Sequence, residues 1–197
     1  MAVIKMTHSS LSLGKRTNVH IYVPDQVQDN TKILYLLHGL SDNDEDWFNN
    51  TQLIKAVAGR NLIIVCPDGG KSFYSNMNGN YNYFDYIAKE LPDYIEKLLP
   101  FSGRSEDRYI AGLSMGGYGA FKFALSFPER YAGAASFSGV MDVIERMKNN
   151  TFDDLCPPFC GGTTHSVLPN HYIADVRIME DRKWVVPRCG LCFFITF

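Results

Sequence analysis

The chain has 197 residues, a length typical of one domain, and 46% of its residues are hydrophobic while 20% are charged. Its 19 basic and 21 acidic residues give a formal net charge of −2, which argues against nucleic-acid or membrane-surface binding driven by overall charge. The 13% aromatic content and the scattered glycine and proline residues exclude a disordered chain and a coiled coil.

The cellular compartment is predicted from signal-like segments, membrane-spanning runs and the number of cysteines. The first sixteen residues contain no apolar run of the kind found in secretion signals, and no run of about 18 apolar residues predicts a membrane-spanning helix. The five cysteines are an odd number, which favours free thiols over a disulfide framework. We therefore expect a cytoplasmic protein.

Strand-like and helix-like patterns alternate through residues 1–140. Short apolar runs predict buried strands, and apolar residues at three-and-four spacing predict helices. Pro92 lies inside one helical pattern and predicts a kink or a late helix start, while residues 73–83, rich in Tyr and Asn, predict a long surface loop. We expect strands at residues 19–23, 32–37, 61–66, 107–113 and 131–137, and helices at residues 47–59, 84–99 and 115–127.

This alternation predicts a single α/β domain with a doubly wound, mostly parallel sheet. In such sheets the functional residues gather beyond the carboxyl ends of the strands. The loops after Leu37 and after Leu113 are therefore the first places to look for a site.

The segment from Gly112 to Gly116 reads Gly-Leu-Ser-Met-Gly, a Gly-x-Ser-x-Gly pattern between a predicted strand and a predicted helix. Ser114 would occupy a tight, strained turn in which side chains at the two glycine positions would collide with neighbouring elements. The turn would raise the serine hydroxyl above the sheet and direct the first helical amides toward a forming oxyanion. The pattern predicts Ser114 as a nucleophile; a glycine-rich turn with a bystander serine is the alternative.

The motif His38-Gly39-Leu40 follows the predicted strand of residues 32–37. With the serine turn, it predicts an oxyanion hole made of the backbone N–H groups of Leu40 and Met115. We expect His38 and Gly39 to shape this loop. His38 precedes the serine in the chain, whereas the base in this arrangement comes last, so we do not expect it to be the catalytic base.

Five motifs lie along the chain, at residues 36–40, Trp47, 65–70, 111–120 and 135–139. In this order they resemble those of the esterase D family, in particular bacterial tributyrin esterases and S-formylglutathione hydrolases. The resemblance implies an α/β-hydrolase fold and a cofactor-free carboxylesterase acting on short acyl esters or thioesters, in which Ser114 is acylated and then released by water. It also implies that Gly69, Gly70, Tyr74 and Tyr81 line the mouth of the site.

The family pattern stops after Gly139. Members of the family continue with strand–helix units, each of roughly 30 residues or more, that carry an acidic residue and then a histidine. Residues 163–197 show no clear period and end in an apolar segment. We therefore expect a C-terminally truncated member that lacks its last strand–helix units, with its last ~35 residues read out of frame or otherwise foreign. Such a chain would have weak or no activity and would self-associate through the exposed edge of the strand at residues 131–137.

The tail still offers candidates for the missing catalytic groups. The chain order serine, acid, histidine allows Asp153 or Asp154 with His165 or His171. The spacing between these residues is shorter than the strand and helix that usually separate an acid from its base. Solvated loop histidines are the alternative.

Two other clusters are weighed against metal binding. The Cys-x-x-Cys at Cys189 and Cys192 has no second such pair, so zinc is not expected, although a four-thiolate site with Cys156 and Cys160 remains an alternative. The acidic residues 42–46 lack the glycine and closing glutamate of a calcium loop, and predict a solvated loop ending in a helix cap. We expect neither a metal nor a cofactor.

Three functions remain open. The first is a serine carboxylesterase acting on a small-molecule ester or thioester through Ser114, and the second is a non-catalytic relative that binds an ester-like ligand. The third is a redox or metal module built on the tail cysteines. We expect no nucleic-acid and no membrane partner.

Overall fold

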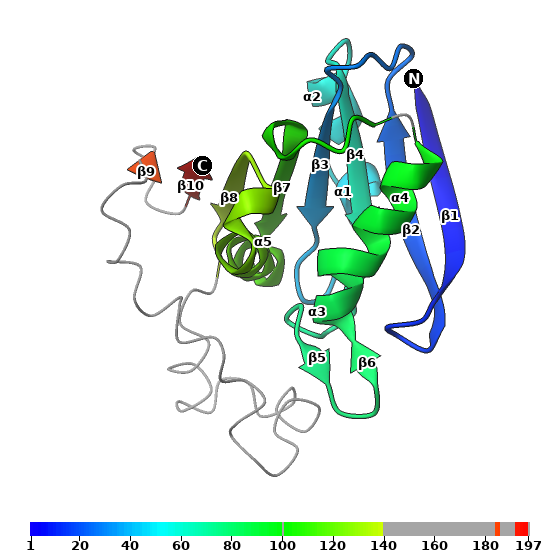
Figure 1. Ribbon diagram of the computed structural model, residues 1–197, viewed down its shortest axis with the longest axis vertical. Helices are drawn as coiled ribbons and strands as arrows, with labels where there is room; N and C mark the ends of the chain where they lie inside the picture. Colours follow the sequence, from blue (N-terminus) through cyan, green and yellow to red (C-terminus); the bar gives the residue numbers. More distant parts are fainter. Residues whose placement is uncertain (100, 140–183, 186–191, 197) are drawn as a thin grey trace.

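The computed structural model describes residues 1–99, 101–139, 184–185 and 192–196. Within these residues the main sheet has the strand order β1-β2-β4-β3-β7-β8-β10-β9 (Figure 1). Its central strands β4, β3, β7 and β8 run parallel, and the strands on either side are antiparallel. The strands are β1 (Ala2–Ser10), β2 (Lys15–Val23), β3 (Lys32–Leu37), β4 (Leu62–Pro67), β7 (Arg108–Leu113), β8 (Gly133–Phe137), β9 (Trp184–Val185) and β10 (Cys192–Thr196).

Helices cover both faces of this sheet, which confirms the doubly wound α/β architecture. Successive side chains of a strand point to opposite faces, so Ile33 and Leu37 of β3 face one core and Leu36 faces the other. The first core is closed by α3 (Tyr83–Asp85), the π-helical turn Tyr86–Glu90, α4 (Leu91–Leu98) and α5 (Met115–Ser126). The second is closed by α1 (Asp46–Asn49) and α2 (Leu53–Val57).

Pro92 is accommodated without ending its helix. It lies in the first turn of α4, directly after the wider π-helical turn. Proline has no N–H and its ring crowds the carbonyl four residues earlier, which here belongs to Ala88. The guanidinium of Arg130, at the end of the 3-10 turn Pro128–Arg130, donates to that carbonyl. Of the two outcomes that the sequence predicts, a kink or a late helix start, the second is found: α4 begins at Leu91, with Pro92 in its first turn.

Three other sequence predictions need correction. Strand β1 was not expected, because its solvated side chains give it no apolar alternation. The predicted helix at residues 47–59 is two short helices. The predicted surface loop at residues 73–83 contains a small hairpin, β5 (Asn76–Met77) with β6 (Tyr81–Asn82), and begins with the buried residues Phe73 and Tyr74.

The edge of β8, which the sequence analysis expected to be exposed, is paired. Strand β10 runs antiparallel to β8 from the pair Cys192–Phe137 to the pair Thr196–Gly133. The prediction of self-association through a bare β8 edge is therefore wrong in its structural premise. Strand β10 also lies in the segment where the sequence showed no strand pattern.

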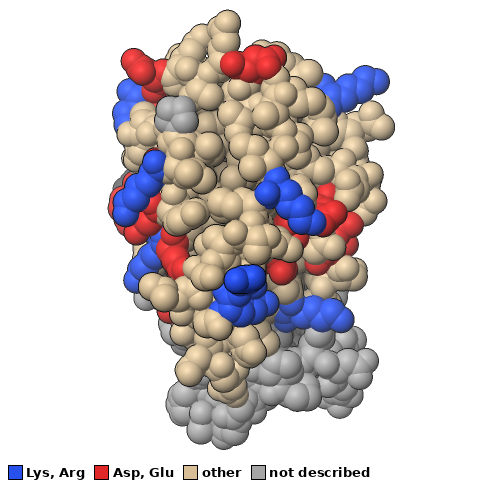
Figure 2. All heavy atoms as spheres, turned by 90° about the vertical axis from the view of Figure 1, so that its right-hand side faces the viewer, with Lys and Arg blue, Asp and Glu red and all other residues tan. Residues whose placement is uncertain are grey.

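Charge is mixed on the face that carries β1 and α4. Figure 2 shows basic and acidic side chains interspersed there, and Lys5 of β1 is paired with Glu45. Among the described residues, no helix is both long and apolar enough to cross a membrane.

Candidate active site

Ser114 lies between the end of β7 and the start of α5, in a strained conformation with φ 54° and ψ −113°. A positive φ at a non-glycine residue costs on the order of 1–3 kcal/mol. The backbone around it is held on both sides: its N–H donates to the Phe137 carbonyl over 2.8 Å, and its carbonyl accepts from the Tyr118 N–H over 3.1 Å. The side chain is half-buried, so the turn presents the hydroxyl at the carboxyl end of the sheet.

The glycines beside Ser114 meet the steric demand expected of such a turn. A Cβ on Gly112 would lie 2.3 Å from the Gly116 carbonyl oxygen. A Cβ on Gly116 would lie 2.3 Å from the Leu37 oxygen and 2.7 Å from the His38 oxygen. These contacts are too short for any side chain, so the first turn of α5 packs directly on the backbone at the end of β3.

The loop at residues 38–42, which we call the Gly39 loop, lies beside the serine turn. A Cβ on Gly39 would be 3.7 Å from the Leu113 oxygen. The Gly39 N–H donates to Asp42 Oδ2 over 3.1 Å, and the Asp42 N–H donates back to the Gly39 oxygen over 3.3 Å. Among the described residues, the N–H groups of Leu40 and Met115 have no acceptor. Both predicted oxyanion donors are therefore available.

His38 is a buried component of this loop, with 1% of its surface exposed. Its Nε2 accepts the Gly69 N–H over 2.8 Å, so the ring proton lies on Nδ1, which donates to the Gly39 oxygen over 2.6 Å. Both ring nitrogens are thus occupied by backbone groups. His38 therefore links the Gly39 loop to the backbone at Gly69, and its ring has no nitrogen left to serve as a base for Ser114.

Tyr74 does not line the mouth of the site as the resemblance implied. It is fully buried, and its hydroxyl donates to the His38 oxygen over 2.9 Å. Its ring fills a slot between Gly69 and Gly119, where an added Cβ would lie 2.4 Å from the ring in each case. Tyr81 is 45% exposed on the hairpin. Sequence reasoning missed the role of Tyr74, because Gly69 and Gly119, which make room for its ring, lie in segments that only the fold brings together.

The comparisons with known proteins agree with this geometry. Residues 10–176 match the Esterase family, described as "Putative esterase". The chain belongs to this family. It is 28% identical over 152 residues to an acetyl esterase of Caldicellulosiruptor saccharolyticus, an alignment that covers 72% of this chain and 57% of that relative. The chain thus spans little more than half of the length of the curated relative that it matches.

Two solved structures from Staphylococcus aureus are similar as well. The fluorophosphonate-binding serine hydrolase FphF is 29% identical with a TM-score of 0.78, and the S-formylglutathione hydrolase FrmB is 29% identical with a TM-score of 0.70. Each alignment covers 88% of this chain and 72% of the other. These matches confirm the resemblance to esterase D-like α/β-hydrolases and the α/β-hydrolase fold.

A base for Ser114 is not found within the described part of this esterase-family chain. The predicted candidates Asp153, Asp154, His165 and His171 lie outside the described residues, as do Cys156, Cys160 and Cys189. Among the described residues, no side chain forms a hydrogen bond with the Ser114 hydroxyl. His8 and His20 are engaged elsewhere, with Tyr86 and Asp44 respectively.

The acidic segment at residues 42–46 is not the solvated loop and helix cap that the sequence predicted. Asp44 is 4% exposed and accepts from His20 Nδ1 over 2.7 Å, while Glu45, at the N-cap of α1, makes no capping hydrogen bond. The potential ligand atoms of His20, Asp44 and Glu45 lie within 4.8 Å of one another. Since His20 pairs with Asp44 and Glu45 pairs with Lys5, this cluster anchors the segment that follows the Gly39 loop.

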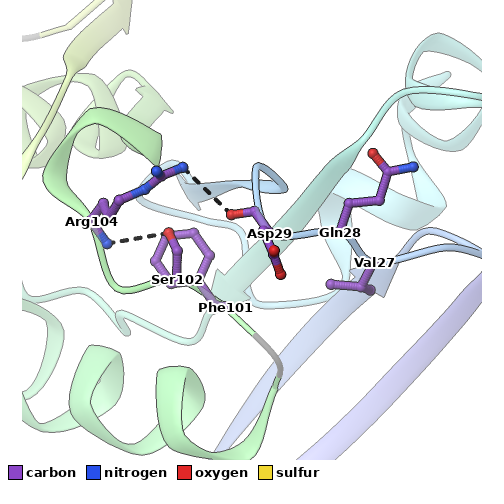
Figure 3. Close-up of a pocket in the computed structure, with 6 residues that line it drawn as sticks. All are labelled: Val27, Gln28, Asp29, Phe101, Ser102 and Arg104. Atoms are coloured by element: carbon purple, nitrogen blue, oxygen red, sulfur yellow. Dashed lines mark hydrogen bonds between the residues drawn. The ribbon is translucent and has the colours of Figure 1, made fainter.

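A surface cavity of about 330 Å³ lies at the opposite end of the sheet (Figure 3). Its lining residues come from the segments just before β3 and just before β7, whereas the Gly39 loop and Ser114 follow those strands. Arg104 lines it, but its guanidinium is bonded to Asp107 and to the Asp29 carbonyl. The cavity is therefore separate from the serine site. It is lined by Val27, Gln28, Asp29, Phe101, Ser102 and Arg104.

Proposed function

We propose that this chain is a serine carboxylesterase that cleaves small acyl esters or thioesters through an acyl-enzyme on Ser114. The observation that carries the proposal is the strained Ser114 at the start of α5, beside two N–H groups without an acceptor among the described residues. Membership of the Esterase family supports the reaction class. The names of the similar proteins, acetyl esterase and S-formylglutathione hydrolase, support a small acyl group.

The proposed reaction begins when Ser114 Oγ attacks the acyl carbonyl carbon and its proton passes to a base. The carbonyl oxygen takes up negative charge and accepts hydrogen bonds from the N–H groups of Leu40 and Met115. Collapse of this intermediate expels the alcohol or thiol, which recovers the proton, and water then hydrolyses the acyl-serine. One such donor is typically worth ~3 kcal/mol in the transition state, and the amino end of α5 adds a favourable dipole.

The base and its acidic partner are assigned to the tail candidates: His165 or His171, with Asp153 or Asp154. Loss of a triad member typically lowers the rate by about 10⁴- to 10⁶-fold. The activity of this chain therefore depends on whether one of these histidines reaches Ser114. A non-catalytic relative that binds an ester-like ligand is the second candidate, favoured by the absence, among the described residues, of any side chain bonded to the Ser114 hydroxyl.

The test is hydrolysis of p-nitrophenyl acetate by the whole chain and by its Ser114→Ala variant. Turnover that the Ser114→Ala substitution abolishes would show that a base reaches Ser114, and His165→Ala and His171→Ala would then identify it. Equal rates for the parent chain and Ser114→Ala would reject the esterase and leave the ligand-binding alternative. An unchanged rate in both histidine variants would reject the assigned base.

A further inference from the structure

The Leu40 N–H belongs to a peptide unit whose other end is already fixed. A peptide group is planar, so the direction of the Leu40 N–H is set by the Gly39 carbonyl in the same unit. That carbonyl accepts hydrogen bonds from His38 Nδ1 and from the Asp42 N–H. The direction of the proposed oxyanion donor thus depends on where His38 and Asp42 hold the Gly39 oxygen.

The preceding peptide unit, between His38 and Gly39, is fixed at both ends as well. Its N–H donates to Asp42 Oδ2, and its carbonyl accepts the hydroxyl of Tyr74 over 2.9 Å. Among the described residues, the Tyr74 hydroxyl is the one side-chain donor to that carbonyl. Without it, this peptide unit would be held at its N–H end alone, and rotation there would move the next unit with it.

Tyr74 is itself held in one place. Its ring lies between Gly69 and Gly119 with no room for a Cβ on either side, and its backbone has φ 51°. The Ser72 hydroxyl accepts the Tyr74 N–H over 3.0 Å and donates to the Gly69 oxygen over 2.6 Å. A bulky non-glycine residue at positive φ is a strained conformation that persists where the surroundings impose it, often at functional sites.

From these contacts we propose that Tyr74 is a positioning residue for the Leu40 N–H. Its hydroxyl fixes the carbonyl of the His38–Gly39 peptide, and this peptide in turn sets the direction in which the Leu40 N–H points toward the oxyanion. This inference rests on the proposed function, because it gives a catalytic purpose to a loop that the esterase reaction would use. Tyr74 does not touch the substrate in this account. It acts through His38 and Gly39.

The test compares Tyr74→Phe with Tyr35→Phe. Both tyrosines are buried, and each hydroxyl donates one 2.9 Å hydrogen bond, to His38 and to Glu96 respectively. Each substitution keeps the ring and removes one hydroxyl. Because Tyr35 donates to a charged carboxylate, Tyr35→Phe should lower the thermal unfolding midpoint at least as much as Tyr74→Phe, so a fall in kcat confined to Tyr74→Phe would not reflect lost stability. Since deleting an oxyanion donor costs about 10²- to 10³-fold in kcat, we expect a misdirected donor in Tyr74→Phe to cost about tenfold, with KM unchanged and Tyr35→Phe unaffected.

A second readout does not require activity. Amide hydrogen exchange at the Gly39 and Gly69 N–H groups should be faster in Tyr74→Phe and unchanged in Tyr35→Phe, because only the first loosens the Gly39 loop. If the parent chain proves inert, the proposed function fails, and the exchange rates still decide whether Tyr74 holds the loop. An unchanged kcat in Tyr74→Phe, an equal fall in both variants, or unchanged exchange at Gly39 and Gly69 would overturn the proposal.

Discussion

At the amino ends of β3 and β7, buried charged side chains pair with one another, whereas at the carboxyl ends polar side chains bond to backbone groups. At the first end, Arg108 forms a two-point pair with Glu96, over 2.8 and 2.5 Å, and Tyr35 donates to the same carboxylate. At the second end, the side chains of His38, Asp42 and Tyr74 hold backbone carbonyls and N–H groups of the Gly39 loop.

The two ends of the strands therefore serve different purposes, one stabilising the fold and the other preparing a reactive site. In the Glu96–Arg108 pair the charged groups bond to each other, so they are not free to bind a ligand. Around Ser114, the side chains fix the backbone and leave two N–H groups without an acceptor among the described residues. A site whose donors are backbone groups needs such support, because their directions follow from the loop conformation. We therefore expect substitutions at the two ends to separate folding from reactivity.

The largest effect is expected from Gly116→Ala. The new Cβ would meet the Leu37 and His38 oxygens at 2.3 and 2.7 Å, and these backbone atoms cannot move without displacing the Gly39 loop. Reactivity of Ser114 should fall by about 100-fold or more, as on loss of an oxyanion donor. The measurement is the rate of labelling by a fluorophosphonate probe.

Gly117→Ala is the matched control for that substitution. Its Cβ would meet the Ser136 hydroxyl, a side-chain atom, at 2.5 Å, and its nearest backbone contacts, Gly139 Cα and the Gly112 oxygen, lie at 3.0 and 3.1 Å, longer than the 2.3 Å contact at Gly116. We expect a smaller loss of labelling than in Gly116→Ala. A larger loss in Gly117→Ala would contradict the packing of the serine turn on the end of β3.

The next effect is on stability at the opposite end. Glu96→Gln leaves the guanidinium of Arg108, whose side chain is 8% exposed, without its carboxylate. Breaking a buried ion pair from one side typically costs about 3 kcal/mol of the free energy of unfolding. Chemical denaturation should show this loss, while the labelling rate of Ser114 in the folded protein stays the same.

Glu106→Gln is the control for the ion-pair prediction. Glu106 pairs with Arg104 at the same end, but its side chain is 67% exposed. An exposed pair contributes little, so the change in unfolding free energy should stay within about 0.5 kcal/mol. Equal losses in Glu96→Gln and Glu106→Gln would contradict the distinction between buried and exposed pairs.

A smaller, pH-dependent effect is expected from Lys122 of α5. Burial lowers the pKa of this lysine to about 7. In the buried position its amino group donates a hydrogen bond to Ser75 Oγ over 2.6 Å. The unfolded chain then binds more protons than the folded one above pH 7. The free energy of unfolding should therefore rise with pH from 7 to 8.5, by at most ~1.4 kcal/mol per unit.

Lys122→Met should flatten that rise, because methionine has nothing to titrate. Lys97→Met, at an exposed position of α4, should leave it unchanged. The measurement is urea denaturation of the three chains at several pH values. A slope in Lys122→Met as steep as in the parent chain would show that another group is responsible.

The sequence predicted the part of the fold in which local pattern and tertiary packing agree. The expected strand at residues 32–37 coincides with β3, because a strand buried on both faces is apolar throughout. The serine turn was recognisable because its two glycines and Ser114 stand in a fixed five-residue pattern, although the atoms that crowd Gly116 belong to Leu37 and His38. Strand β1 has no such pattern, since pairing with β2 defines it more than burial does.

The buried positions of Tyr74 and Asp44 could not be predicted from the sequence. Their roles depend on partners 36 and 24 residues away, His38 and His20. Composition places tyrosine- and aspartate-rich segments on the surface, and nothing local indicates that one member of each segment is buried. Hydrogen bonds between distant loops became visible only when the sheet brought those loops together.

The most direct test of the central claim is to treat the whole chain with a fluorophosphonate probe and locate the adduct by peptide mass spectrometry. The account predicts one phosphonylated residue, Ser114, with no adduct in Ser114→Ala. An unlabelled Ser114 in a chain that unfolds cooperatively, or an adduct at another serine, would contradict it.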